Sequence, residues 1–156
     1  MNYAAKFLTN PFILTPLGSW AEAQILKTVI HAVVNKKFDI NRLFGDGGMP
    51  SGHSATVTSL AAITGLVKGF DTYEFAVSFV LAVIVCHDAM GVRLETGKQT
   101  QVLKELTKGL EMLTSKKLPE VKLKEFVGHT PTQVGAGVTL GAVNALLVHY
   151  LLNKDK

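Results

Sequence analysis

Four apolar segments, each about as long as a membrane-spanning helix, constrain this chain more than any other feature. They cover about residues 11–34, 51–69, 73–90 and 131–152. A helix needs about 20 mostly apolar residues to cross the hydrocarbon core of a bilayer. Hydrophobic residues make up 47% of the chain and charged residues only 18%, a balance too apolar for a typical soluble domain. We therefore predict an all-α, integral-membrane bundle of four transmembrane helices in a single domain, residues 1–156.

The polar segment 91–130, between the third and fourth apolar segments, is predicted to contain one further helix. Its apolar residues recur at helical spacing, with charged residues on the other side, as follows: Val102, Leu103, Leu106, Leu110 and Leu113 against Lys104, Glu105, Lys108 and Glu111. This pattern predicts an amphipathic helix that either lies at the membrane interface or covers the end of the bundle. Gly65-x-x-x-Gly69 and Gly137-x-x-x-Gly141 predict close approach of helix backbones.

Basic residues are concentrated in the two polar connections, 35–50 and 91–130. Four spans place both connections on one side of the membrane, and the positive-inside rule puts that side in the cytoplasm. The net charge of +4 suits anionic lipid headgroups, and nucleic acid is not an expected partner because aromatic residues are not interleaved with the basic ones. The N-terminus lacks a signal-peptide pattern, and the single Cys86 excludes an internal disulfide and provides no metal-ligand spacing.

Residues 47–54 (Gly-Gly-Met-Pro-Ser-Gly-His-Ser) lie where a polar connection runs into the second apolar segment. Glycines allow a tight turn, and a proline suits the first turn of a helix. The free N–H groups at a helix start and the positive end of its dipole bind anions. His53 adds a side chain that can give or take a proton near neutral pH. These residues predict a phosphate pocket, with an ordinary loop and helix cap as the structural alternative.

Further polar residues are predicted to lie on the same side of the membrane. Gln24, Lys27 and His31 share one face of the first helix, which must face the bundle interior if that helix spans the bilayer. Asp88 ends the third apolar segment, where an ionisable residue is a functional candidate. His129 stands near the start of the fourth helix. Two histidines at helix starts could act as nucleophile and general acid on a phosphate ester.

Four ordered motifs within residues 20–145 resemble the type-2 phosphatidic acid phosphatase and vanadium-haloperoxidase superfamily, in its small divergent bacterial and plant branch. They are Ala23-Gln24-x-x-Lys27, residues 47–54, Asp88-Ala89-Met90-Gly91-Val92-Arg93 with Gly97-Lys98-Gln99, and Gly128-His129-Thr130-Pro131. The resemblance implies a bacterial cell-membrane enzyme, independent of metals and cofactors, that removes phosphate from a lipid through a phosphohistidine intermediate. The implied substrates are the phosphomonoesters or diphosphates phosphatidic acid, phosphatidylglycerol phosphate and prenyl phosphates, and the motifs do not choose among them.

The resemblance also implies roles for individual residues. His129 would be the nucleophile and His53 the general acid. Ser51 and the backbone of Gly52 would bind phosphate. The cations expected to hold the phosphate charge are Lys27 and Arg93, with Arg42 and Lys98 as further candidates.

The sequence departs from the family pattern at three places. Lys36 and Arg42 are separated by five residues where the family has six, and Leu43 replaces the usual proline. The family's Ser-Arg before the last histidine is missing, so Arg93 would have to substitute for it. Gln133 stands where an acidic residue normally orients the imidazole, and it can accept a hydrogen bond but carries no charge.

These departures leave alternatives open. Glu125 or Asp88 could take the orienting role of the missing acid, and Asp88 is therefore a candidate catalytic residue. A protein that keeps the fold but only binds anionic lipid headgroups is one alternative to the phosphatase. A small transporter or channel subunit, with Lys27 and Asp88 lining a polar path, is the other.

Overall fold

The computed structural model describes residues 2–40, 43, 47–114 and 128–154. The α-helices in these residues are α1 (Tyr3–Leu8), α2 (Pro11–Asn35), α3 (Gly52–Lys68), α4 (Tyr73–Met90), α5 (Val92–Thr114) and α6 (Pro131–Asn153). The described residues contain no strand, which confirms the all-α prediction. The four predicted apolar segments correspond to α2, α3, α4 and α6, and α1 was not predicted.

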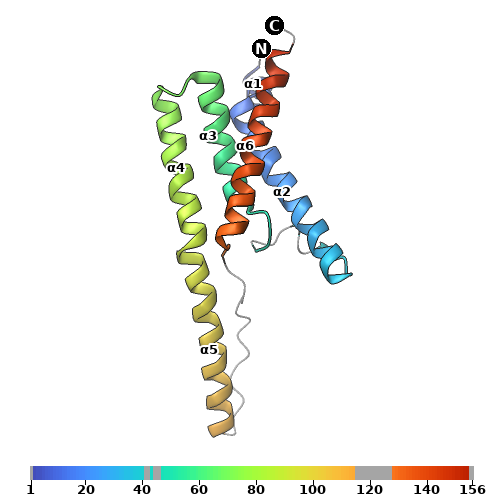
Figure 1. The fold of residues 1–156 in the computed structure, drawn as a ribbon, viewed down its shortest axis with the longest axis vertical. Coiled ribbons are helices and arrows are strands. Elements are labelled where there is room, and N and C mark those ends of the chain that lie inside the picture. Colours follow the sequence, from blue (N-terminus) through green and yellow to red (C-terminus); the bar gives the residue numbers. More distant parts are fainter. Residues whose placement is uncertain (1, 41–42, 44–46, 115–127, 155–156) are drawn as a thin grey trace.

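Helix α3 is the centre of the bundle. It packs against α2, α4 and α6, and α6 also packs against α2. Figure 1 shows α4 along one side of α3, with α6 and α2 on the other, and both chain termini at the same end. The opposite end therefore holds the starts of α3 and α6 and the end of α4.

The contact between α3 and α6 depends on two glycines. A Cβ atom at Gly137 would collide with the carbonyl oxygen of Ser51, and one at Gly141 would collide with the carbonyl oxygen of Ala55. The two helix backbones can approach this closely only because these positions carry no side chain. The prediction made from Gly137-x-x-x-Gly141 is therefore confirmed.

The other glycine pair has a different role. A Cβ atom at Gly65 would meet the rings of Phe70 and Phe75, which are side chains and not a helix backbone. Gly69 lies beyond the end of α3 and has a φ of 110°, a conformation that glycine adopts without strain. Interpreting Gly65-x-x-x-Gly69 as a site of close backbone approach was therefore wrong, because this pair makes room for aromatic rings and ends a helix.

Small and polar side chains fill the interior, whereas large apolar side chains face outward. Ala23, Ala55 and Ala145 are fully buried, and Val33 and Val34 are more than 70% exposed. This distribution is the reverse of that in a soluble protein and suits a bundle surrounded by lipid.

Two helical stretches in the described residues are long and apolar enough to cross a membrane, namely Tyr73–Leu113 and Pro131–Asn153. In the most apolar 18 residues of each stretch, only 18% and 22% are buried, whereas the core helix of a soluble protein is mostly buried. Four such helices were predicted. Helix α3 is shorter, at 17 residues, and α2 is less apolar because it carries Glu22, Gln24 and Lys27.

The amphipathic helix predicted within residues 91–130 is present as α5. It was expected either at the membrane interface or over the end of the bundle, and the second position is wrong. Only Gly91 separates α4 from α5, and Figure 1 shows α5 continuing the line of α4 away from the bundle. Among the described helices, α5 packs against α4 alone. It therefore does not cover the end of the bundle, because Gly91 does not turn the chain back towards α3 and α6.

Candidate functional site

Main-chain hydrogen bonds join three helix ends at one end of the bundle. The Ser51 N–H donates to the carbonyl oxygen of Gln133 at 2.9 Å, which links the start of α3 to the start of α6. The His129 N–H donates to the carbonyl oxygen of Ala89 at 3.0 Å, which links the chain before α6 to the end of α4. The sequence motifs on these segments were predicted to lie on one side, and the structure brings them together.

Ser51 caps the start of α3. Its Oγ accepts a hydrogen bond from the Ser54 N–H at 3.3 Å and another from the Ser54 hydroxyl at 3.0 Å, and both side chains are fully buried. Helix α3 begins at Gly52, so Pro50 precedes the cap and does not lie in the first turn as predicted. The free N–H groups of this first turn are the kind of donors that bind an anion.

Lys27 brings a cation to the same turn. Its side chain is only 4% exposed, and its Nζ donates a 2.6 Å hydrogen bond to Oε1 of Gln24. The aliphatic part of Lys27 lies against Gly48, whose φ is 100° and where an added Cβ would be 3.0 Å from Lys27 Cγ. A buried ammonium group needs hydrogen-bonding partners, and it attracts an anion strongly because little water screens it.

Gln24 extends this arrangement and was absent from the predicted site residues. An added Cβ at Gly52 would lie 3.4 Å from Trp20 Cδ1 and 3.9 Å from Gln24 Oε1, so α2 is in close contact with the start of α3. The spacing of three residues between Gln24 and Lys27 placed them on one helix face and could have identified Gln24 as a partner. Both side chains are buried, which confirms that this face looks into the bundle.

The contacts of Gln133 orient His129 and show which of its ring nitrogens donates. The Thr130 N–H donates to Gln133 Oε1 at 3.2 Å, so the oxygen of the amide, and not its nitrogen, faces this end of α6. The same oxygen lies 3.2 Å from His129 Nδ1. Because Oε1 can only accept, Nδ1 must carry a proton, and in the neutral imidazole the lone pair then lies on Nε2. Gln133 therefore selects the Nδ1-protonated tautomer of neutral His129.

This arrangement follows from a helix-capping pattern in the sequence. Thr130 and Gln133 form a capping box, in which the Thr130 Oγ1 accepts from the Gln133 N–H while the Gln133 side chain accepts from the Thr130 N–H. A threonine followed three residues later by glutamine is the signal for such a box, and it could have predicted where the Gln133 side chain points.

The two histidines are neighbours. Their ring centroids are 6.2 Å apart, with the ring planes at 60°. His129 is 1% exposed, whereas His53, in the first turn of α3, is partly exposed. The fold therefore brings together the two histidines that were predicted to act on one phosphate.

Two further predicted site residues lie on α4 and α5. Asp88 is partly buried in the last turn of α4 and precedes Ala89, which accepts the His129 N–H. Lys98 is exposed on α5 and forms a 2.6 Å ion pair with Glu95, so the structure does not show it at the site.

The remaining candidates cannot be placed at the site. Arg42 and Glu125 lie outside the described residues, and of Arg93 only the backbone, in α5, is described. Among the described residues, no group of three His, Cys, Asp or Glu side chains is arranged to hold a metal ion.

Two comparisons with known proteins gave a match. Residues 8–144 match the family model described as "Divergent PAP2 family". The chain is 36% identical over 154 residues to "Uncharacterized membrane protein YuiD" of Bacillus subtilis (strain 168), a match that covers 93% of this chain and 98% of the relative. No solved structure gives a significant match. The family match spans nearly the whole bundle and all four motifs, and the chain therefore belongs to the divergent PAP2 family.

Proposed function

We propose that this protein is a metal-independent membrane phosphatase that hydrolyses a phosphomonoester or diphosphate of a lipid through a phosphohistidine intermediate. The observation that carries the proposal is the pairing of His129 with His53. One imidazole is buried and oriented by Gln133, and the other is partly exposed at a centroid distance of 6.2 Å. A nucleophile fixed as one tautomer beside a second titratable group fits two-step phosphoryl transfer.

In the first step, the Nε2 lone pair of His129 attacks phosphorus and forms an N–P bond. The bond between phosphorus and the lipid oxygen breaks, and the leaving oxygen takes a proton from the His53 imidazolium. The products are a lipid alcohol, or a lipid monophosphate when the substrate is a diphosphate, and phosphorylated His129.

In the second step, water replaces the lipid. Neutral His53 removes a proton from the water as its oxygen attacks phosphorus, and the N–P bond breaks. Inorganic phosphate leaves, and both histidines return to their starting protonation states. The Gln133 side chain acts throughout by holding the Nδ1 proton of His129 on the side away from phosphorus.

Lys27 and the start of α3 stabilise the phosphate. The ammonium group of Lys27, held by Gln24, offsets part of the negative charge on the phosphoryl oxygens. The N–H groups of the first turn of α3, which begins with Gly52 and is capped by Ser51, donate to the same oxygens. We include Arg93, Arg42 and Asp88 in the proposed site on the resemblance of their motifs alone.

We also propose that α2, α3, α4 and α6 all cross a bacterial cell membrane, with the site on the cytoplasmic face. The apolar exterior and the family relationship to a protein named as a membrane protein support the membrane location. The concentration of basic residues in the connections at the site end supports the orientation. A lipid phosphate would then reach the histidines laterally from the cytoplasmic leaflet.

The function is tested by trapping the intermediate. Purified protein in mixed micelles is mixed with phosphatidic acid carrying ³²P in its phosphate and quenched within one turnover. We expect label on the wild type that is stable in base and labile in acid, as a phosphohistidine is, and no label on His129→Ala. Label that persists in His129→Ala would refute the nucleophile.

The same purified protein also tests the alternative that it only binds headgroups. That alternative holds if the protein binds vesicles containing phosphatidic acid through Lys27 but releases no phosphate from phosphatidic acid, phosphatidylglycerol phosphate or a prenyl phosphate. The neutral side chain of Gln133, which cannot balance the charge of an imidazolium, is the observation that would explain such a loss of catalysis.

A further inference from the structure

A cavity of about 420 Å³ lies at the end of the bundle away from the histidines. Three helices line it, namely α2 near its start, α3 over its last turns and α4 over its first turns. One of its lining residues, Lys68, follows His53 by fifteen residues, which is about 22 Å of helix. The cavity is therefore separate from the proposed phosphate site.

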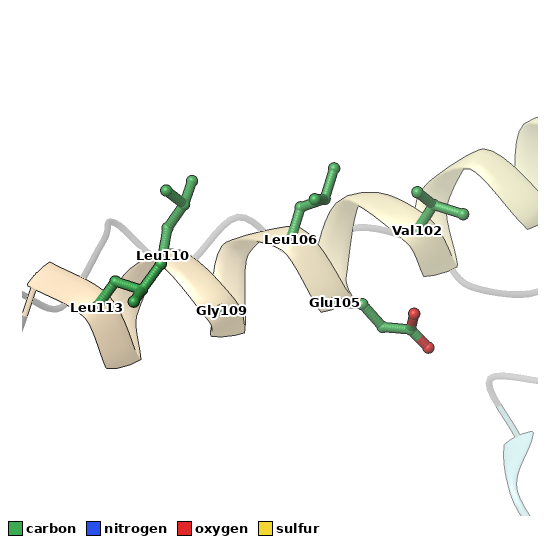
Figure 2. A pocket seen from close by; sticks show the side chains of 6 residues that line it. All are labelled: Val102, Glu105, Leu106, Gly109, Leu110 and Leu113. Carbon is green, nitrogen blue, oxygen red and sulfur yellow. The ribbon is translucent and has the colours of Figure 1, made fainter.

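The cavity is a gap in the packing of the bundle. Helices α2 and α4 each pack against α3, but among the described residues they do not pack against each other. Helix α3 thus forms the floor, and α2 and α4 form the two sides. The hollow along α5 is of a different kind, because one helix provides all of its lining. Figure 2 shows Leu106 and Leu110 on one side of that helix and Glu105 on the other.

The inner part of the cavity is apolar. It includes two polar residues, but the Thr64 hydroxyl donates to the Leu60 carbonyl oxygen at 2.8 Å, and the Ser78 hydroxyl donates to the Phe75 carbonyl oxygen at 2.9 Å. Both hydroxyl groups thus bond within their own helices. The apolar side chains of the lining are those of Phe12, Leu60, Val77 and Leu81. A wall of this composition suits a hydrocarbon ligand such as an acyl chain.

The outer end of the cavity lies at the level of a membrane surface. Lys68 is the last residue of α3, and the apolar stretch of α4 that is long enough to cross a membrane begins at Tyr73. Tyrosine and lysine are typical of the interface between bilayer and water. From Tyr73 to Leu81 the wall extends about 12 Å inward, which is less than half of a hydrocarbon core of about 30 Å. The cavity therefore faces the lipids of one leaflet.

Two opposite charges lie at this outer end. Lys68 and Glu74 both line the cavity, and no ion pair joins either of them to another described residue. The Lys68 Nζ lies 6.0 Å from the centre of the Phe12 ring, which belongs to the same wall, so the ammonium group is beside the cavity. A headgroup that matches this end carries both an anionic and a cationic group.

The two charges select one kind of phospholipid headgroup. A phosphate diester matches Lys68, and an ammonium group matches Glu74. A primary ammonium donates charge-assisted hydrogen bonds to a carboxylate, whereas a quaternary choline has no N–H to donate. A headgroup that carries phosphate alone, as in phosphatidylglycerol, would put a like charge beside Glu74. Phosphatidylethanolamine has one phosphate and one primary ammonium, and it therefore matches both residues.

We propose that this cavity binds one molecule of phosphatidylethanolamine from the leaflet opposite the histidines. Its phosphate pairs with Lys68 and its ammonium with Glu74, and one acyl chain lies on α3 between α2 and α4. The bound lipid fills the gap that these two helices leave, so it stabilises the folded bundle. This binding requires the membrane location but not the proposed phosphatase activity.

Lipid retention tests the site. The full-length protein is placed in nanodiscs that contain equal amounts of phosphatidylethanolamine, phosphatidylcholine and phosphatidylglycerol with identical acyl chains. Native mass spectrometry then identifies the lipid that stays bound. We expect one phosphatidylethanolamine per chain, retained at least tenfold more than either of the other lipids. Glu74→Gln should abolish this preference, and Lys68→Gln should weaken the retention of all three lipids.

The matched controls remove charges at the same end of the bundle but outside the cavity. Asp71→Asn and Lys6→Gln alter residues that do not line it, and we expect both to retain lipid as the wild type does. Retention of the three lipids in equal amounts by the wild type would mean adventitious surrounding lipid only and would overturn the proposal. Equal losses of preference in Asp71→Asn and Glu74→Gln would do the same.

Filling the cavity gives an independent readout. Val77 lines the cavity and is 48% exposed, so Val77→Trp places a large side chain in the path of the acyl chain without overfilling the core. Phosphatidylethanolamine added in detergent should raise the unfolding temperature of the wild type by several degrees and leave that of Val77→Trp unchanged. Val83→Trp is the control, because Val83 is 53% exposed and does not line the cavity. No stabilisation of the wild type, or equal stabilisation of Val77→Trp, would contradict the proposed site.

Discussion

Oε1 of Gln133 lies 3.2 Å from Nδ1 of His129 and accepts a hydrogen bond from the Thr130 N–H at the same distance. A single neutral oxygen thus fixes the tautomer of a buried histidine. In the proposed mechanism, an uncharged amide takes over the orienting part of the role that an acidic side chain has in the wider family. It does not provide the negative charge that would stabilise an imidazolium.

This relationship predicts opposite effects for two substitutions at residue 133. Gln133→Glu keeps the acceptor and suits the capping box, and its charge makes His129 a stronger base, so we expect kcat to rise several-fold. Gln133→Leu removes the acceptor, and we expect kcat to fall about tenfold or more, the equivalent of one lost hydrogen bond. Phosphate release from phosphatidic acid measures both. Equal rates for wild type and Gln133→Leu would show that Gln133 does not orient the nucleophile.

His53→Ala should affect substrates according to their leaving groups. A lipid alkoxide needs a proton as it leaves, so we expect kcat for phosphatidic acid to fall by about 10²–10⁴. A nitrophenolate ion leaves without a proton, so the loss on p-nitrophenyl phosphate should be much smaller in the phosphorylation step. Single-turnover rates on both substrates provide the comparison. The same loss on both would contradict a general-acid role.

Lys27→Met should weaken both the binding of phosphate and the fold. Removing the ammonium group leaves Oε1 of Gln24 without this donor inside the bundle, so we expect the fold to lose about 1–3 kcal/mol. The hydrogen bond from a charged group to phosphate is worth about 1.5–3 kcal/mol, so we expect vanadate or phosphate to bind about 10–100-fold more weakly. Thermal unfolding in detergent and inhibition by vanadate are measured on the same sample. Unchanged vanadate inhibition would remove Lys27 from the site.

Gly48→Ala should strain the turn that lies against Lys27. The φ of 100° disfavours any residue with a Cβ by about 1–2 kcal/mol, and that Cβ would press on Lys27 Cγ at 3.0 Å. We expect a lower melting temperature and weaker vanadate inhibition. Gly135→Ala is the matched control, because an added Cβ at that helical position meets nothing within 4 Å. A similar loss in both variants would mean that the effect is not specific to the turn.

Sidedness is tested with single cysteines in a Cys86→Ser background. Lys37 lies just beyond the end of α2, at the site end, and Asp71 lies in the turn between α3 and α4, at the other end. With the site in the cytoplasm, a membrane-impermeant reagent should label Asp71→Cys in intact cells and Lys37→Cys only after permeabilisation. The reverse pattern would invert the proposed topology.

The sequence was sufficient to predict the main helices and the meeting of the two histidines. Helix lengths follow from the apolar segments, and caps such as Ser51 and Thr130 mark where α3 and α6 begin. Four antiparallel helices place alternate connections at one end, so His53 and His129 had to share it. The burial of Lys27 and Gln24 followed from their common helix face.

Other features could not be predicted because they depend on tertiary contacts or on a single backbone conformation. Glycine can end a helix or continue its direction, and the pattern around Gly91 does not distinguish the two, so the straight path from α4 into α5 was missed. Gly65 and Gly141 occupy similar motifs, but one meets aromatic side chains and the other a helix backbone. Only the fold decides which neighbour each glycine has.

The hydrogen bond from the Ser51 N–H to the Gln133 carbonyl oxygen has a consequence for how such a site can change over time. Main-chain atoms set the spacing of the segments that bear His53 and His129, and the glycines of α6 keep those segments in contact. The side chain at position 133 can therefore be exchanged while the backbone that carries both histidines stays in place. Under the proposed mechanism, substitution there would tune the reactivity of the site, from fast catalysis with an acid to slow catalysis with an amide, on an unaltered scaffold.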